Sequence, residues 1–295
     1  MKRTLLLTLV LCLLLSFAGC TQPPAETEPP KVMDLSGKYE LDTVRNEAII
    51  TGTGAAQAND CNGRVFYQIF VGSFSDSNGD GIGDLRGIIN RFDYLNDGDI
   101  NSGKSLGVQG IWLSPIFTSP SYHKYDAKDY YQVDWRFGTE DDLKELIELC
   151  HSRNVQLILD LVINHTSSEH PWFLEAKQSR NNPKHDWYVW RDGTPDCPPN
   201  EMKSNFSGSA WQWCEERQQY YLHLFTPQQP DLNWENEKVR DAVFDMMNWW
   251  CEKGIDGFRM DVISLISKVP GLPDGPMAPG AVYGRHNQYT EHGPR

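Results

Sequence analysis

The sequence contains no pair of cysteines at the CxxC spacing of a metal site. It has no long apolar stretch, since the run over residues 5–15 is too short to span a membrane comfortably. Basic residues are also scarce, because 27 Lys and Arg stand against 40 Asp and Glu and give a net charge of −13. This balance argues against nucleic acid or an anionic membrane surface as a partner.

The N-terminus has the pattern of an export signal. Lys2 and Arg3 precede the apolar run, and Ala18-Gly19-Cys20 follows it, as at a bacterial lipoprotein cleavage box. Residues 1–20 are therefore predicted to be a lipoprotein signal peptide, with Cys20 lipidated; an ordinary secretory signal is the alternative. The protein is expected to be secreted and held by this lipid at the outside of a bacterial cell membrane.

Residues 21–60 are rich in Pro, Glu, Thr, Gly and Ala. Such a composition cannot bury a core, so this segment is predicted to be a disordered tether. Five cysteines follow the signal region, so at least one stays unpaired. A bridge between Cys197 and Cys214 is one option that the sequence leaves open.

From Arg64 onward, predicted strands and helices alternate. This order indicates an α/β fold with a parallel sheet. Thr139 is expected to cap one helix, with acidic residues in its first turn. About 70 residues of weak periodicity follow the third strand, too many for a connecting loop, and predict a small inserted domain. Strands are expected over residues 65–71, 108–113, 155–162 and 258–263, and helices over 85–95, 139–153 and 238–253.

The stretch Gly257-Phe258-Arg259-Met260-Asp261-Val262-Ile263 reads as a buried strand with charges at alternate positions. Arg259 and Asp261 then point the same way. Burying such charges is costly unless they pair or act on a ligand. Asp160, within the third strand, is expected to pair with Arg259. His165, at the end of that strand, is expected to bind a hydroxyl group, because parallel barrels place their sites there.

Three loop segments carry further polar groups. The Asp76–Asp84 loop predicts structural calcium, and the alternative is a solvated acidic turn. Tyr125-Asp126 suits stacking on a pyranose with its hydroxyls bound, although the dipeptide alone is weak. Gln229-Pro230-Asp231-Leu232-Asn233 reads as a turn leading into a helix. The expected calcium ligands are the side chains of Asp76, Asn78, Asp80 and Asp84 and the carbonyl of Ile82.

Taken together, four segments in this order resemble the α-amylase family of glycoside hydrolases (family 13). The segment from Gln229 is similar to the signature of the oligo-1,6-glucosidase group, whereas residues 120–139 look closer to secreted bacterial α-amylases. The resemblance covers about residues 64–295. The four segments are Tyr125-Asp126, Asp160 to His165, Gln229 to Asn233, and Gly257 to Ile263.

The resemblance implies the N-terminal half of a (β/α)8 TIM barrel with a small domain inserted after strand 3. Residues 61–164 would hold barrel strands 1–3, and residues 165–233 would be the inserted domain. Residues 234–295 would supply helix 3, strand 4 and the following loop.

The resemblance also implies roles for single residues. Asp261 would be the nucleophile, held ionised by Arg259. The remaining substrate-binding positions would be Tyr125, Asp126, His165, Phe206, Gln229 and Val262, of which Val262 resembles the residue of enzymes that accept α-1,6 bonds. The Asp76–Asp84 loop matches the calcium loop of the oligo-1,6-glucosidase group. Lys268 falls where that group has a Lys, beside Asn164, in place of an α-amylase calcium.

The implied function is retaining hydrolysis of α-1,6 or α-1,4 glucosidic bonds in α-glucan or malto- and isomalto-oligosaccharides. Such hydrolysis needs two carboxylates. The family's acid/base Glu ends strand five, and this chain is expected to stop before it and to be inactive alone. Glu291, in a loop like the one after strand four, is not expected to replace it. Alternatives are an endo-acting α-amylase lipoprotein on starch, a trehalose-phosphate hydrolase, and a non-catalytic starch-binding or transporter heavy-chain-like barrel.

Overall fold

The computed structural model describes residues 64–99, 101–206 and 208–274. The predicted signal peptide, Cys20, the tether and Glu291 therefore lie outside the described residues. Within the described part, no helix combines the length and apolarity that crossing a membrane requires. The elements are β1 (Phe66–Ile69), α4 (Val71–Phe74), α5 (Leu85–Asn90), α6 (Phe92–Leu95), β2 (Gly110–Leu113), β3 (Phe117–Thr118), β4 (Asp129–Val133), α7 (Glu140–Ser152), β5 (Gln156–Leu161), α8 (Pro171–Ala176), β6 (Trp190–Arg191), β7 (Trp211–Cys214), β8 (Gln219–Leu222), α9 (Glu237–Glu252), β9 (Gly257–Met260) and a 3₁₀ helix (Ile263–Leu265).

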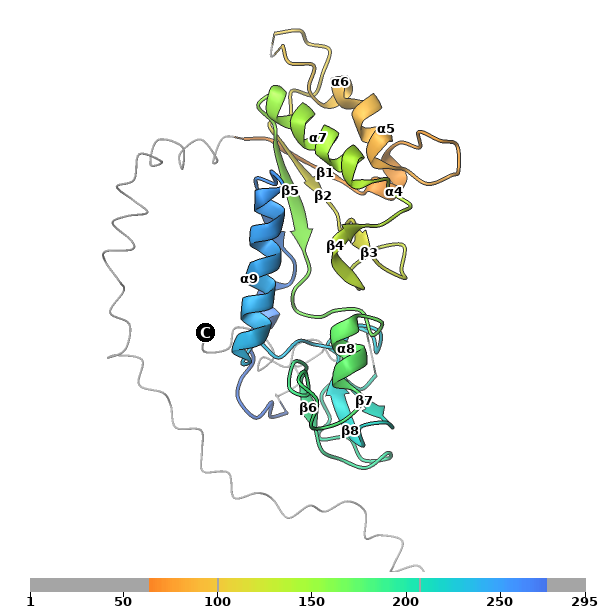
Figure 1. Ribbon diagram of the computed structural model, residues 1–295, viewed down its shortest axis with the longest axis vertical. Coiled ribbons are helices and arrows are strands. Elements are labelled where there is room, and N and C mark those ends of the chain that lie inside the picture. Colours follow the sequence, from red (N-terminus) through yellow and green to blue (C-terminus); the bar gives the residue numbers. More distant parts are fainter. Residues whose placement is uncertain (1–63, 100, 207, 275–295) are drawn as a thin grey trace, which may run out of the picture. The chain divides into compact units, whose positions relative to one another are not determined.

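Four strands form a parallel sheet in the order β1-β2-β5-β9. Figure 1 labels the first three of them. The predicted α/β class and parallel sheet are thereby confirmed. The register pairs Asp160 of β5 with Arg259 of β9. This pairing brings two charged residues 99 positions apart in the sequence onto adjacent strands.

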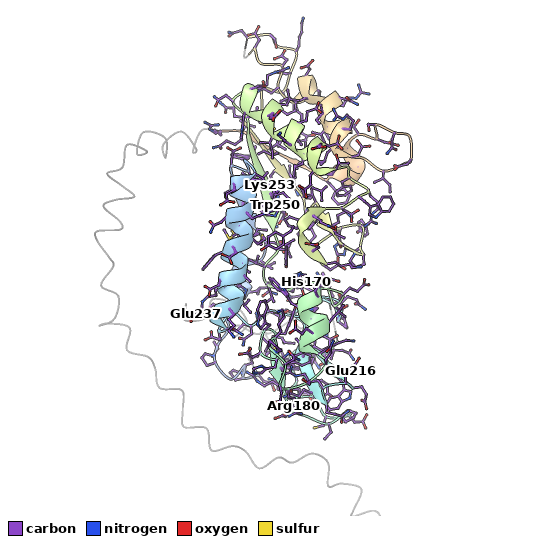
Figure 2. The ribbon with its side chains drawn as sticks, viewed as in Figure 1. His170, Arg180, Glu216, Glu237, Trp250 and Lys253 are labelled. Atoms are coloured by element: carbon purple, nitrogen blue, oxygen red, sulfur yellow. The ribbon has the colours of Figure 1, made fainter. Side chains whose placement is uncertain are left out.

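Two helices cover the sheet with apolar faces, as their periodicity predicts. Thr139 begins α7 with a full capping box, since its side chain accepts from Asp142 N and the Asp142 carboxylate accepts from Thr139 N. Trp250 of α9, labelled in Figure 2, is 1% exposed. Its indole donates to Tyr130 O at 2.9 Å. Trp250 also contacts Phe117, with ring centroids 5.6 Å apart. These contacts join α9 to the β3–β4 pair within the main hydrophobic core.

Four details differ from the expected elements. The strand expected over residues 65–71 ends at Ile69, and α4 begins at Val71. The helix expected over residues 85–95 is interrupted at Arg91, which ends α5 and begins α6. The antiparallel pair β3–β4 was not predicted, because its two strands are short and its pairing contains a register shift. The strand expected over residues 258–263 ends at Met260, since Val262 has φ +40° and ψ +39°. A β-branched residue is an outlier in that left-handed region.

β9 is also less buried than the sequence predicts. All four of its residues are half-buried, because β9 pairs only with β5 among the described strands and so forms an edge of this sheet. The central strand β5, in contrast, has four buried residues.

A second region follows β5. It contains α8 and the antiparallel sheet β6-β8-β7, in which both outer strands pair with β8. Aromatic residues fill its interior: Phe173 stacks on Trp190 at a centroid distance of 5.8 Å and contacts Tyr221 edge-on. Cys214 is a buried free thiol, so it forms no disulfide with Cys197.

Candidate active site

The candidate site is built around Arg259, whose guanidinium lies between two carboxylates. Its Nη1 donates to Asp160 Oδ1 at 3.0 Å and to Asp261 Oδ1 at 2.5 Å. Both aspartates are buried, so each needs a charged partner, and they share this one. The pairing of Asp160 with Arg259 that the sequence predicts is confirmed.

Asp160 also accepts from two aromatic side chains. Trp112 Nε1 donates to its Oδ2 at 3.2 Å, and the Tyr125 hydroxyl donates to the same oxygen at 3.0 Å. The Arg259 guanidinium lies over the Trp112 ring, 4.8 Å from its centroid. Burial raises the pKa of Asp160, although Arg259 opposes that shift. Burial alone would lower the pKa of Arg259, but Asp160 and Asp261 together raise it. The guanidinium is therefore a permanent cation.

Sequence reasoning did not identify Trp112. The pairing of β2 with β5 shows why Trp112 belongs to the site. Trp112 pairs with Ile158, two positions before Asp160 on β5, and therefore projects on the same face of the sheet as Asp160.

Asp261 keeps one carboxylate oxygen available. Its Oδ1 accepts from Arg259, whereas no group within the described residues donates to Oδ2. Its backbone N donates to Leu161 O at 3.0 Å, which ties the start of the turn to β5. The residue is 8% exposed, so the carboxylate is largely buried but still accessible to solvent. A carboxylate fixed at one oxygen and open at the other can act as a nucleophile.

His165 contacts two of the other predicted positions. Its Nε2 lies 2.9 Å from Tyr125 O and 3.0 Å from Gln229 Nε2. Burial lowers the pKa of His165, so its ring is neutral. A neutral ring uses Nε2 either to donate to the carbonyl or to accept from the amide, depending on its tautomer. The structure thus brings Tyr125, His165 and Gln229 together, while hydroxyl binding by His165 stays a prediction.

Asp126 is buried beside Tyr125 and accepts hydrogen bonds from the side chains of Ser119 and Ser121. The sequence indicated Asp126 but neither serine. Both serines precede Asp126 in the same loop and hold the carboxylate in place, so their contribution is to orient it.

Phe206 lies further from the charged centre. It is 64% exposed and contacts Phe225, with ring centroids 5.6 Å apart, and Phe225 in turn lies 5.1 Å from the His165 ring. Phe225, which the sequence did not indicate, therefore links Phe206 to the site. Val262 directly follows Asp261 and is half-buried.

Lys268 forms a buried ion pair with Asp231. Its Nζ lies 3.0 Å from Asp231 Oδ2 and 3.1 Å from Asn164 Oδ1, and it also donates to Leu265 O. Asp231 is fully buried, and Asn164 Nδ2 donates to it at 3.1 Å. Lys268 thus lies beside Asn164, where the resemblance puts it. The ion pair ties the segment after β8 to the segment after β9, and the hydrogen bond to Asn164 adds the end of β5.

The Asp76–Asp84 loop was predicted to bind calcium. The Asp76 carboxylate accepts from the backbone N–H groups of Asn78, Gly79 and Gly81, which lower its pKa. Asp84 caps α5 by accepting from Gly87 N at 2.6 Å. The described residues hold no cluster of three or more His, Cys, Asp or Glu arranged for a metal ion.

The loop still offers oxygen donors of the hard type that calcium takes. The side chains of Asp76, Asn78 and Asp80 stand at alternate positions on an exposed turn, and Ile82 offers its carbonyl. Asp84 would join them only while also capping α5. The donor chemistry therefore fits calcium, and the ligand set stays a prediction.

Comparison with known proteins gives consistent matches. A family model described as the α-amylase catalytic domain matches residues 68–295. An oligo-1,6-glucosidase of Parageobacillus thermoglucosidasius is 53% identical over 232 residues, which cover 78% of this chain and 40% of that protein. The chain thus spans about 40% of the length of the curated relatives it matches.

Two solved structures are also similar. One is a trehalose-6-phosphate hydrolase of Bacillus licheniformis, with a TM-score of 0.71 and 46% identity over 79% of this chain and 40% of that chain. The other is an isomaltulose synthase mutant of Erwinia rhapontici NX5 in complex with sucrose, with a TM-score of 0.68 and 46% identity over 72% of this chain and 37% of that chain.

Proposed function

Since this chain belongs to the α-amylase catalytic-domain family, we propose that the intact gene product hydrolyses α-glucosidic bonds in oligosaccharides. The observation that carries the proposal is the Asp160–Arg259–Asp261 cluster at the carboxyl ends of β5 and β9. Parallel barrels place their catalytic groups at this end of the strands. The oligo-1,6-glucosidases and α-glucosidases among the relatives support oligosaccharides with α-glucosidic bonds as substrates, and malto- and isomalto-oligosaccharides are the proposed ones.

The proposed mechanism is double displacement. Asp261 Oδ2 attacks the anomeric carbon and forms a glycosyl ester, while the leaving oxygen takes a proton from a second carboxylic acid. Water then cleaves the ester, with the second carboxylate as base, so the configuration is retained. Arg259 Nη1 holds Asp261 Oδ1 by a hydrogen bond, which orients the carboxylate before attack. Tyr125, Asp126, His165, Gln229, Phe206 and Val262 are the proposed substrate contacts.

We further propose that the described residues form the first four strands of a (β/α)8 barrel, with residues 165–233 inserted after the third. The parallel sheet and the separate sheet β6-β8-β7 support this architecture. We also propose that the protein is exported and anchored to the cell surface through a lipid on Cys20.

The substrate preference has a direct test. The intact gene product is expected to release glucose from isomaltose much faster than reducing ends from starch, since oligo-1,6-glucosidases are among the relatives that are 50% or more identical to this chain. The two rates are compared at equal concentrations of glucosidic bonds. Preferential attack on starch would identify an endo-acting α-amylase instead.

Calcium binding at the Asp76–Asp84 loop is tested by melting temperature. A chelator should lower the melting temperature of the intact gene product by roughly 5 °C, because ligand binding stabilises only the folded state. Added calcium should restore it. Asp80→Asn should remove this response, whereas Asp99→Asn, in another exposed loop, should not. A melting temperature that the chelator leaves unchanged would contradict calcium binding at this loop.

A further inference from the structure

A row of aromatic rings leads outward from the candidate site. It starts at Tyr125, whose hydroxyl contacts Asp160. The His123 ring lies 6.0 Å from Tyr125, the Tyr122 ring lies 5.3 Å from His123, and Phe70 lies 6.4 Å from Tyr122. Phe70 directly follows β1, so it comes from the same end of the sheet as Asp160 and Asp261.

Tyr122 is the most exposed member of this row, at 78%. An aromatic side chain that open to water contributes little to packing. Tyr combines a large apolar face with a polar hydroxyl, so it suits binding surfaces where the ring packs on a ligand and the hydroxyl contacts water. A sugar ring, with an apolar C–H face and hydroxyls at its rim, matches that surface.

The loop that holds Tyr122 is anchored by buried polar contacts. Ser121 Oγ accepts from Lys124 N and donates to Asp126. Lys124 Nζ donates to Asp134 at 2.6 Å, and both side chains are 1% exposed. Lys124 also has φ +62°, a left-handed conformation that turns the chain between Tyr122 and Tyr125. The exposed ring is thus carried on a fixed loop, and little freedom is lost when it stacks on a ligand.

We propose that Tyr122 and Phe70 form a stacking surface for a second glucose unit of the substrate, adjoining the unit predicted at Tyr125. The inference rests on the proposed function and extends it from a single sugar ring to two. It identifies the substrate as a linear gluco-oligosaccharide that extends past the reacting unit along this aromatic row.

The test compares ligands of one and three rings on the intact gene product. Tyr122→Ala should raise the KM for isomaltotriose or maltotriose roughly three- to tenfold, the range for loss of one aromatic contact. The inhibition constant of glucose, which fills one position, should change less than twofold. Tyr122→Phe should keep the trisaccharide KM, because the ring remains. Trp135→Ala, at an 80% exposed aromatic position outside the row, is the matched control and should have no effect.

Each other result has a definite meaning. An unchanged trisaccharide KM in Tyr122→Ala would overturn the stacking surface while leaving the hydrolase in place. An equal loss for glucose would also overturn it, since Tyr122 would then act by positioning Tyr125. Failure of the unsubstituted protein to bind or cleave any of these sugars would overturn the proposed function itself.

Discussion

Replacing Asp261 with Asn in the intact gene product should lower kcat for α-glucosides by a factor on the order of 10⁴ to 10⁶, the range seen when a catalytic nucleophile is removed. An amide is neutral and does not displace the leaving group from the anomeric carbon. Asn has nearly the shape of Asp, and its side-chain oxygen can still accept from Arg259 Nη1, so the fold should persist. The measurement is the rate of glucose release, with circular dichroism to verify folding.

Asp192→Asn provides the matched control for that substitution. Asp192 is exposed and pairs with Arg180 in the second region, away from the Asp160–Arg259–Asp261 cluster. Its replacement should leave kcat within twofold. An Asp261→Asn variant that retains more than a tenth of the kcat would show that another group attacks the sugar.

Lys268→Met is the second change expected to have a large effect, in this case on stability. Removing one partner of a buried ion pair leaves the other charge uncompensated and costs about 3–5 kcal/mol. Asp231 is fully buried, and the donors left to it, Asn164 Nδ2 and Leu224 N, are uncharged. The free energy of unfolding of the intact gene product, measured in urea, should fall by that amount.

Two further variants distinguish a lost charge pair from lost packing. Adding Asp231→Asn to Lys268→Met should recover much of the stability, because no unpaired charge then stays buried. Lys144→Met removes a lysine that is exposed and should change the stability little. If the double variant is as unstable as the single one, the lysine stabilises by its contacts rather than by its charge.

The sequence predicts those parts of the fold that follow local rules. Thr139 is recognisable as a helix cap because a hydroxyl and an acidic first turn occur together, and α7 begins there. The strand ending near Leu161 and the helix containing Trp250 follow from apolar periodicity. The pair of Asp160 with Arg259 was predictable because two charges within apolar strands need each other.

Contacts set by long-range pairing were harder to predict. Tyr125 reaches Asp160 across 35 positions, and Trp112 reaches it across 48. Only the strand register decides such contacts, and register is a property of the assembled sheet. The turn at Val262 was missed for a related reason. A β-branched residue favours a strand locally, and here the surrounding structure imposes a left-handed conformation.

The central claim is that Asp261 bonds covalently to the substrate's glucosyl unit. Incubating the intact gene product with a fluorinated α-glucosyl probe, followed by peptide mass spectrometry, tests this claim directly. The account predicts one added fluoroglucosyl unit on the peptide that contains Asp261 and no adduct in Asp261→Asn. A label on a different carboxylate, or an active protein that takes no label, would contradict it.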